Sequence, residues 1–227
     1  MLKKVKSKSL IRYVHDKCLK AKYFKKIYVA TCDRKIFNEI KMNGGHVIMT
    51  NIFHKGCVSR IAEAVEKEKS INKNDFICIV QGDEVQVDYK ILDKFSNFIL
   101  KKKKKYSIFN VLSKIKNDDE YKSKSVIKAL LDNKKNIINF SRTNVTYGIK
   151  SFNKDLSKKV LRQTGIIAIR KDFLIRYSKM KRSFFEIKES VDMLRYIENE
   201  FKIHSYIINK TMIGIDTPKD YYKFINS

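Results

Sequence analysis

The apolar residues fall into two kinds of stretch, short β-branched or aromatic runs and longer segments with helical spacing. The first half of the chain has three strand-like runs, at residues 26–31, 46–50 and 76–80. Four segments with helical periodicity accompany them, at residues 9–22, 33–42, 60–69 and 89–104. Strands that alternate with helices in this way are typical of an α/β fold with a largely parallel sheet.

The pattern changes after Tyr106, where strand-like runs follow one another without long helices between them. We expect the remaining elements to be strands at 107–114, 125–131, 136–141, 165–170 and 202–208, a helix at 188–200, and a last helix from Pro218. The sheet is therefore predicted to be mixed. The polar, irregular residues 143–159 are predicted to form a loop or an oligomer contact, and residues 1–227 a single domain with no visible linker or repeat.

Charge is the most unusual property of the composition. The 227 residues include 50 Lys and Arg against 24 Asp and Glu, which gives a formal net charge of +26. This excess raises the hypothesis of a nucleic-acid-binding protein. However, the lysines are spread along the whole chain and no recognition motif accompanies them, so we expect no nucleic-acid partner. The charge also suits anionic substrates such as a nucleoside triphosphate and a sugar carboxylate.

The same sequence indicates a cytoplasmic protein. No stretch approaches the roughly 20 consecutive apolar residues that a membrane-spanning helix needs. The basic N-terminal residues are not followed by the apolar run of a signal peptide. The four cysteines are scattered without a paired metal-binding spacing and are expected to be reduced thiols.

Two aspartates stand where a ligand of an open α/β sheet is expected, beyond the carboxyl end of a strand. The apolar strand that ends at Val80 runs directly into Gln81-Gly82-Asp83-Glu84, and Asp216 follows a strand-like run in Gly214-Ile215-Asp216-Thr217-Pro218. A carboxylate in such a position suits Mg²⁺, which prefers oxygen ligands shared with phosphates. From the residues alone, the first segment is equally compatible with a turn, and Asp216 or Thr217 with an N-cap of the last helix.

Both segments resemble motifs of the 3-deoxy-manno-octulosonate (Kdo) cytidylyltransferases, a family of CMP-sugar-acid synthetases, and they occur in the same order. Further segments along nearly the whole chain resemble that family too, namely residues 27–33, 44–50, 60–64, 139–142, 163–166 and 189–195, together with His54. The resemblance implies a Rossmann-like nucleotide-diphospho-sugar transferase (GT-A-like) fold. It also implies a homodimer, with residues 107–160 as the expected contact region.

The resemblance further implies a reaction in which CTP and a 2-keto-3-deoxy sugar acid, Kdo above all, give a CMP-sugar and pyrophosphate for a bacterial surface glycan. It implies a role for each of nine residues. Asp83 and Asp216 would be catalytic and hold Mg²⁺. The nucleotide would be bound by His54, Ser59, Arg60 and Gln81. The sugar acid would be bound by Arg142, Gln163 and Glu189.

The sequence departs from the family in two places. Between His54 and Arg60, the family's Ser-Gly-Thr-Asp is replaced by Lys55-Gly56-Cys57-Val58-Ser59. Val58 cannot donate the hydrogen bond of a threonine, and we expect Cys57 to replace a small residue and not to be a nucleophile. In addition, the family's first apolar strand and the Arg- and Lys-containing loop that wraps the triphosphate have no counterpart here.

The missing strand would lie in the middle of the sheet, so its absence is expected to leave two neighbouring strands with unpaired backbone groups. Two explanations stay open: a start assigned at an internal methionine, or a true truncation without activity. The alternatives to a Kdo enzyme are accordingly a CMP-nonulosonate (acylneuraminate-type) synthetase and a catalytically inactive paralogue that retains the fold.

Overall fold

The computed structural model describes residues 2–5, 8–145, 151–210, 212, 214–215, 221–222 and 224. Eight α-helices lie in this part of the chain: α1 (Leu10–Cys18), α2 (Arg34–Met42), α3 (Cys57–Lys67), α4 (Tyr89–Lys102), α5 (Asp118–Lys122), α6 (Lys171–Lys179), α7 (Phe184–Glu189) and α8 (Leu194–Glu198). A short 3₁₀ helix, η1, spans Leu156–Lys158.

The strands of the described residues are β1 (Lys4–Val5), β2 (Lys8–Ser9), β3 (Tyr28–Thr31), β4 (His46–Met49), β5 (Phe76–Val80), β6 (Ile108–Ser113), β7 (Lys128–Leu131), β8 (Asn136–Ser141), β9 (Val160–Arg170) and β10 (Ile203–Ile208). Six of them form the main sheet in the order β5-β9-β6-β10-β8-β7, with an additional pairing between β9 and β7. The β10–β6 pair is parallel, whereas the β5–β9, β6–β9, β10–β8, β7–β8 and β7–β9 pairs are antiparallel. The prediction of a mixed sheet is therefore confirmed. The expectation of a largely parallel sheet is wrong, because antiparallel pairing dominates the main sheet.

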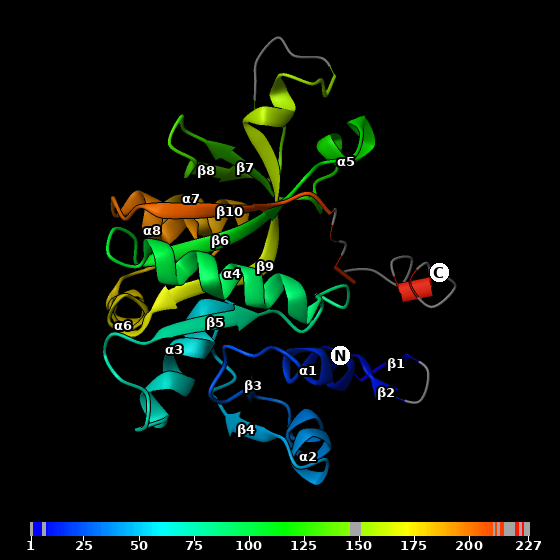
Figure 1. Cartoon of the computed structure of the whole chain (residues 1–227), viewed down its shortest axis with the longest axis vertical. Helices are drawn as coiled ribbons and strands as arrows, with labels where there is room; N and C mark the ends of the chain where they lie inside the picture. Colours follow the sequence, from blue (N-terminus) through cyan, green and yellow to red (C-terminus); the bar gives the residue numbers. More distant parts are fainter. Residues whose placement is uncertain are drawn as a thin grey trace.

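Strands β3 and β4 pair with each other in parallel and form a separate two-stranded sheet. In Figure 1 this small sheet lies on the side of the main sheet where β5 forms the edge. Among the described residues, β3 and β5 are not paired with each other.

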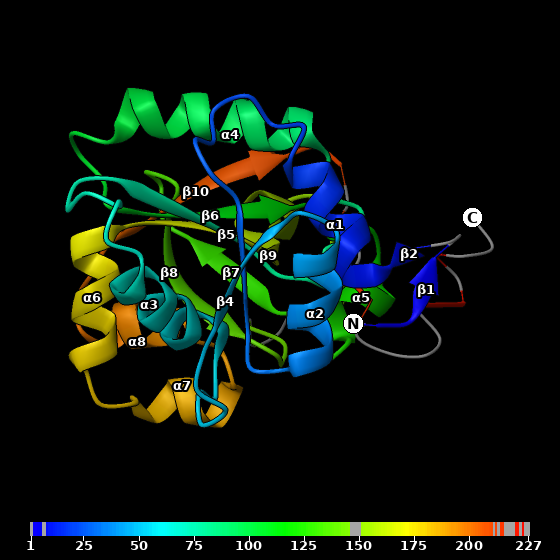
Figure 2. The ribbon, with the colours of Figure 1, turned by 90° about the horizontal axis from the view of Figure 1, so that it is seen from below.

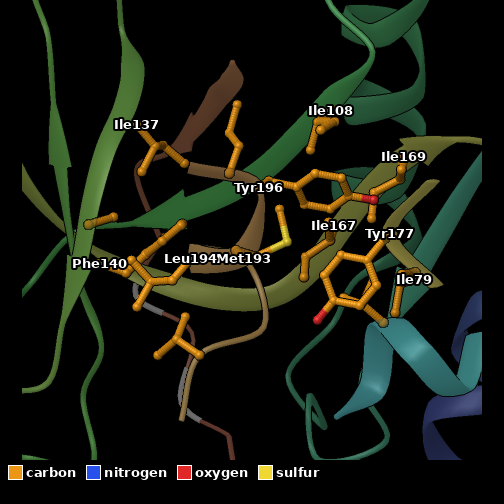
Figure 3. Close-up of a cluster of buried hydrophobic side chains, with 14 of the residues drawn as sticks. Ile79, Ile108, Ile137, Phe140, Ile167, Ile169, Tyr177, Met193, Leu194 and Tyr196 are labelled. Atoms are coloured by element: carbon orange, nitrogen blue, oxygen red, sulfur yellow. The ribbon is translucent and has the colours of Figure 1, made fainter. Parts of the chain in front are cut away.

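Helices cover both faces of the main sheet (Figures 1 and 2). On one face, α4 and α1 contribute Leu92, Phe95 and Leu10 to a cluster that includes Phe109 and Ala168 of the sheet. On the other face, α3, α6 and α8 pack onto a second cluster, shown in Figure 3. Its labelled members include Tyr177, Met193 and Tyr196 from the helical layer and Ile79, Ile108 and Ile167 from the strands. Burial of apolar side chains on both faces stabilises the sheet.

Several elements begin and end where local chemistry predicts. Asp33 caps α2, because its side chain accepts hydrogen bonds from the backbone N–H groups of Lys35 and Ile36. Gly44 follows that helix with φ of 75°, a left-handed conformation that glycine adopts without steric cost. The apolar run from Phe76 to Val80 is β5 itself.

Other predictions were wrong. The sequence pattern did not predict α5, α6 or α7, and the helix expected at 188–200 is interrupted. Its first part belongs to α7, which ends at Glu189, and Ser190 follows in a left-handed conformation with φ of 53°. The predicted last helix from Pro218 lies largely outside the described residues, and the three of its residues that are described, Tyr221, Tyr222 and Phe224, are helical as predicted. In the part of the chain that the structure describes, no helix is long and apolar enough to cross a membrane.

Candidate active site

A pocket with a volume of about 440 Å³ opens where β5 ends beside β9. Its lining comes from the segment after β5, the loop before α3, the residues just before β7 and just after β8, and the middle of β9. The loop before α7, the turn between α7 and α8, and Gly214 complete it. Four of the predicted site residues line it: Gln81, Asp83, Arg142 and Gln163. Its floor includes Ile167 and Met193, which also belong to the apolar cluster of Figure 3.

The turn after β5 is fastened to β9 at Gly165. The backbone N–H of Gln81 donates to the Gly165 carbonyl at 3.0 Å and extends the β5–β9 ladder by one residue. In return, the Gly165 N–H donates to the carboxylate of Glu84 at 2.5 Å, and Glu84 is buried. These two bonds hold the intervening Gly82-Asp83 against the pocket, where Asp83 is part of the lining.

Gln81 occupies space that only a glycine leaves open. A Cβ atom on Gly165 would lie 2.7 Å from the Gln81 Oε1, closer than real contacts allow. The Gln81 amide donates to the Cys57 Sγ at 3.1 Å. Burial, with a further contribution from Asp192, raises the pKa of the Cys57 thiol. A thiol held neutral in this way is a poor nucleophile, as expected for a residue that only fills space.

The segment that leads to Asp216 approaches Asp83. The Ile215 N–H donates to the Asp83 carbonyl at 3.1 Å, and a Cβ atom on Gly214 would lie 4.0 Å from the Asp83 Cγ. Asp216 itself lies outside the described residues, so its pairing with Asp83 stays a prediction. Ile215, the residue before Asp216, is thus in direct contact with Asp83.

Arg142 is held by main-chain oxygens. Its guanidinium donates to the carbonyls of Glu189 at 2.7 Å, Lys124 at 3.1 Å and Ser190 at 3.5 Å. The Glu189 carboxylate accepts from the Arg142 backbone N–H at 2.7 Å and from the Ser141 hydroxyl at 3.4 Å. Glu189 is not among the residues that line the pocket. Its predicted contact with a sugar hydroxyl remains untested, and its contacts in the structure orient Arg142.

Gln163 is positioned by an irregularity in the sheet. The β6–β9 register shifts between Asn110 and Leu112, and the fully buried Asn110 amide donates there to the carbonyls of Thr164 and Ile166. The Gln163 amide in turn donates to the Asn110 Oδ1 at 2.9 Å. The side-chain amide of Asn110 thus replaces part of the interrupted strand pairing and orients Gln163.

The other three predicted nucleotide-binding residues, His54, Ser59 and Arg60, do not line the pocket. We call them the β4–α3 group. Arg60 donates to the Thr50 hydroxyl at 2.8 Å and to the Asn51 carbonyl at 3.2 Å, and the Ser59 hydroxyl donates to the Gly56 carbonyl at 3.0 Å.

The third member of that group, His54, is hydrogen-bonded through its Nε2 to the carboxylate of Glu63 in α3. Although burial acts to raise the pKa of Glu63, hydrogen bonds from Lys67, the Asn51 N–H and His54 lower it to about 2. Glu63 is therefore ionised under ordinary conditions. A role for the β4–α3 group toward a nucleotide stays a prediction.

Five charged residues of the lining were not predicted as site residues: Lys55, Glu84, Arg162, Arg182 and Asp192. Asp192 accepts from the Val58 N–H at 3.0 Å, at the N-terminal turn of α3. A Cβ atom on Gly56 would lie 1.9 Å from its Oδ1. Gly56, predicted from the sequence only as part of a loop, therefore leaves the space that the Asp192 carboxylate occupies. Asp192 belongs to the 189–195 segment already singled out, which was the available signal.

Ser125, Arg142, Arg162 and Gln163 together form what we call the β8–β9 end of the pocket. Arg162 pairs there with Glu120 at 3.1 Å, and Arg182, across the pocket lining, pairs with Glu186 at 3.2 Å. Adjacent residues of a regular strand point to opposite faces. This alternation therefore could not predict that Arg162 and Gln163 both line the pocket.

The donor set near Asp83 is compatible with a hard divalent cation. The carboxylates of Asp83, Glu84 and Asp192 and the amide of Gln81 all line the pocket. Among the described residues, no group of three or more His, Cys, Asp or Glu is arranged to hold a metal by itself. Mg²⁺ does not require such a group, because it is usually bound by one or two carboxylates together with phosphate oxygens.

The mixed sheet with helices on both faces, and a polar pocket at the end of β5, are the architecture of a nucleotidyltransferase. A solved structure of CMP:2-keto-3-deoxy-manno-octonic acid synthetase complexed with CTP superposes with a TM-score of 0.86 at 24% identity, over 99% of this chain and 89% of that one. A 4-diphosphocytidyl-2C-methyl-D-erythritol synthase from Anaerococcus prevotii gives a TM-score of 0.63 at 10% identity, over 98% of this chain and 90% of that one.

The chain belongs to the cytidylyltransferase family, whose sequence model matches residues 1–203. A 3-deoxy-manno-octulosonate cytidylyltransferase from Fusobacterium nucleatum is 32% identical over 99% of this chain and 88% of the relative. The protein of the same description from Thermodesulfovibrio yellowstonii is 28% identical over 95% of this chain and 86% of the relative.

Proposed function

We propose that the chain couples CTP to Kdo and releases CMP-Kdo and pyrophosphate. The observation that carries this proposal is that Asp83, Arg142 and Gln163 line one pocket. The sequence predicted that these three residues bind a metal ion, the sugar carboxylate and a sugar hydroxyl, respectively. The family membership and the names of the curated relatives support it.

In this reaction the anomeric hydroxyl of the sugar acid attacks the α-phosphorus of CTP. A bond forms between that oxygen and phosphorus while the hydroxyl proton is released to the solvent, the bond from the α-phosphorus to the bridging oxygen breaks, and pyrophosphate leaves with the bonding electrons. Such a transfer needs little covalent chemistry from the protein, whose residues act by positioning the reactants and by neutralising charge.

Arg142 is the residue that we assign to the sugar carboxylate. In the described part of the chain its guanidinium donates to carbonyl oxygens and has no carboxylate partner. Arg162 and Arg182, by contrast, are already paired with Glu120 and Glu186. A guanidinium oriented by neutral groups keeps its charge uncompensated, which favours binding of an anion. Gln163, fixed by Asn110, is assigned to a sugar hydroxyl.

Asp83 and Asp216 are the residues that we propose to hold Mg²⁺. When bound, the cation would neutralise charge on the phosphates and polarise the reacting centre. The bonds that fasten Gln81 and Glu84 to Gly165 keep the Asp83 backbone in place for this task. We further propose a homodimer through residues 107–160 and a cytoplasmic location, where CTP is available.

The proposal is tested by incubating the full chain with CTP, Mg²⁺ and single 2-keto sugar acids, and by following pyrophosphate release and the CMP-sugar by mass spectrometry. We expect CMP-Kdo as the main product. A preference for a nonulosonic acid over Kdo would replace the substrate but keep the reaction. Absence of any CMP-sugar at micromolar enzyme concentration would contradict the proposal.

A second candidate is a module that keeps the fold without turnover. One observation favours it: in the described residues β3 and β5 are not joined in one sheet. Isothermal titration calorimetry separates the two candidates. An enzyme binds CTP and the sugar acid and converts them, whereas the module would bind one of them, or neither, without forming pyrophosphate.

A further inference from the structure

Lys128 of β7 is fully buried, with 0% of its surface exposed. Lysine is almost never buried to this extent unless its ammonium has partners, because removing the charge from water costs several kcal/mol. In the structure, the ammonium donates to the carbonyl of Ser123 at 3.0 Å and to the carbonyl of Arg142 at 2.6 Å. Both acceptors are neutral. Such an arrangement is costly for stability alone and calls for another reason to keep the charge.

The two acceptors belong to the two segments that position the Arg142 guanidinium. One is the main chain of Arg142 itself, directly after β8. The other is Ser123, which immediately precedes Lys124, and the Lys124 carbonyl accepts from the Arg142 Nη1 at 3.1 Å. Lys128 thus closes a ring of hydrogen bonds around the base of Arg142. Ser125 and Ile127, on the same side of that ring, line the pocket.

The charged surroundings of Lys128 are asymmetric. Burial lowers the pKa of Lys128 to about 8, the Glu189 carboxylate acts to raise it and the Arg142 guanidinium acts to lower it. From β9, Arg162 stands opposite Lys128 in the strand register and is itself paired with Glu120. The Glu189 carboxylate, which accepts a hydrogen bond from the Arg142 N–H, is the negative charge that acts on Lys128.

We propose that Lys128 is a positioning residue for the sugar-acid substrate, which acts by fixing the main chain of Arg142 and the Ser123–Ser125 segment. The inference rests on the proposed function, because it gives Arg142 the role of carboxylate partner. Lys128 itself does not line the pocket, so it is not assigned a contact with substrate. Its effect is transmitted through the direction in which the guanidinium points.

A lysine that only stabilises the fold predicts a different result from one that positions Arg142. Loss of a merely structural lysine lowers the melting temperature and leaves the Michaelis constants of both substrates alike in the surviving folded enzyme. Loss of a positioning lysine weakens binding of the sugar acid and leaves binding of CTP unchanged, because the two carbonyls that it holds position Arg142.

The test compares wild type with Lys128→Met, which keeps the length of the side chain but removes its donors. We expect the KM for the sugar acid to rise about tenfold, a usual effect of one misplaced charged hydrogen bond, with the KM for CTP changed less than about twofold. Lys171→Met is the matched control, since Lys171 also donates to a carbonyl, that of Ile71 at 2.7 Å, away from the pocket.

Equal changes in both KM values, or no change in a folded Lys128→Met protein, would overturn the proposal. If that variant does not fold, Lys128→Gln, which retains a shorter donor, is judged by the same criterion. Isothermal titration calorimetry of the sugar acid with the wild type distinguishes a failure of the proposed enzyme function from a failure of the proposed role of Lys128. A wild type that binds the sugar acid without turnover fails the proposed function, and the Lys128 comparison is then made on the dissociation constants.

Discussion

The β8–β9 end of the pocket and the β4–α3 group differ in where their side chains find partners. At the β8–β9 end, Arg142 and Gln163 are oriented by main-chain oxygens and by a buried amide that come from distant parts of the chain. In the β4–α3 group, Arg60 and His54 bond to Thr50 and Glu63 close by. At the β8–β9 end, the charge of Arg142 and the hydrogen-bonding groups of Gln163 remain available to a ligand in the pocket. In the β4–α3 group, the side chains of Arg60 and His54 bond to neighbouring protein groups. Preorganisation for a ligand is therefore concentrated at the β8–β9 end.

The largest effect is expected at Asp83, which lines the pocket directly after β5. Asp83→Asn should lower kcat by on the order of 10³-fold, because it removes the charge that is to hold the cation. The fold should be retained, since the amide is of the same size. Steady-state assays with circular dichroism check both points, and Asp118→Asn, on the surface helix α5, serves as control. Activity within threefold of wild type would remove Asp83 from the proposed metal site.

The buried charge of Lys128 should give the β8–β9 end a pH signature. Its pKa is about 8 in the folded chain and 10.5 ordinarily, so between these values the unfolded chain binds more protons. The free energy of unfolding contributed by this residue should therefore rise with pH across that window, by about 3 kcal/mol in total. Urea unfolding at pH 8 and pH 10, compared between wild type and Lys128→Met, measures it. A difference that stays constant with pH would contradict the burial of an ammonium.

Removing the Arg142 side chain tests the β8–β9 end directly. Arg142→Ala should raise the KM for the sugar acid by roughly 10- to 100-fold, as expected for a lost charge-assisted pair worth about 1.5–3 kcal/mol. The KM for CTP should change little. Kinetics with each substrate varied in turn provide the measurement, and Arg34→Ala on α2 is the control. An effect confined to CTP would reverse the assignment of the two regions.

The smallest effect is expected in the β4–α3 group. His54→Ala should raise the KM for CTP only about threefold, since the His54 Nε2 is already bonded to Glu63 and only the other ring nitrogen is left for the nucleotide. The KM for the sugar acid should stay at the wild-type value. The same kinetic scheme applies, and equal KM values for CTP in variant and wild type would leave His54 with a purely structural role.

How far the sequence predicts the fold depends on whether a signal is local. The N-cap at Asp33 and the apolar run from Phe76 to Val80 are local signals, and the structure follows both. The helix expected at 188–200 was wrong because its apolar spacing continues across Ser190. There a left-handed residue ends α7, and nothing in the residue type requires this. Tertiary packing, which includes the buried Glu186–Arg195 ion pair between α7 and α8, decides the break.

For the site, sequence motifs predicted which segments would meet but not what each side chain would contact. Asp83 and Arg142 lie 59 positions apart and line one pocket, as the family resemblance implied. Glu189, predicted to bind a sugar hydroxyl, accepts from the Arg142 backbone N–H, a contact that the motif did not indicate. Asp192, three residues later, lines the pocket, and the sequence indicated it only as part of the 189–195 segment. The left-handed Ser190 lies between these two acids, and motif matching does not resolve which of them reaches the pocket.

The separation of β3–β4 from the main sheet has a consequence for handling the protein. In the described residues, β5 and β3 each have a side without a neighbouring strand, and β5 is a run of five apolar residues. Backbone groups left open on such a strand can pair with a strand of another molecule. Self-association of this kind should grow with protein concentration. Light scattering on a dilution series would then show a larger average mass at higher protein concentration.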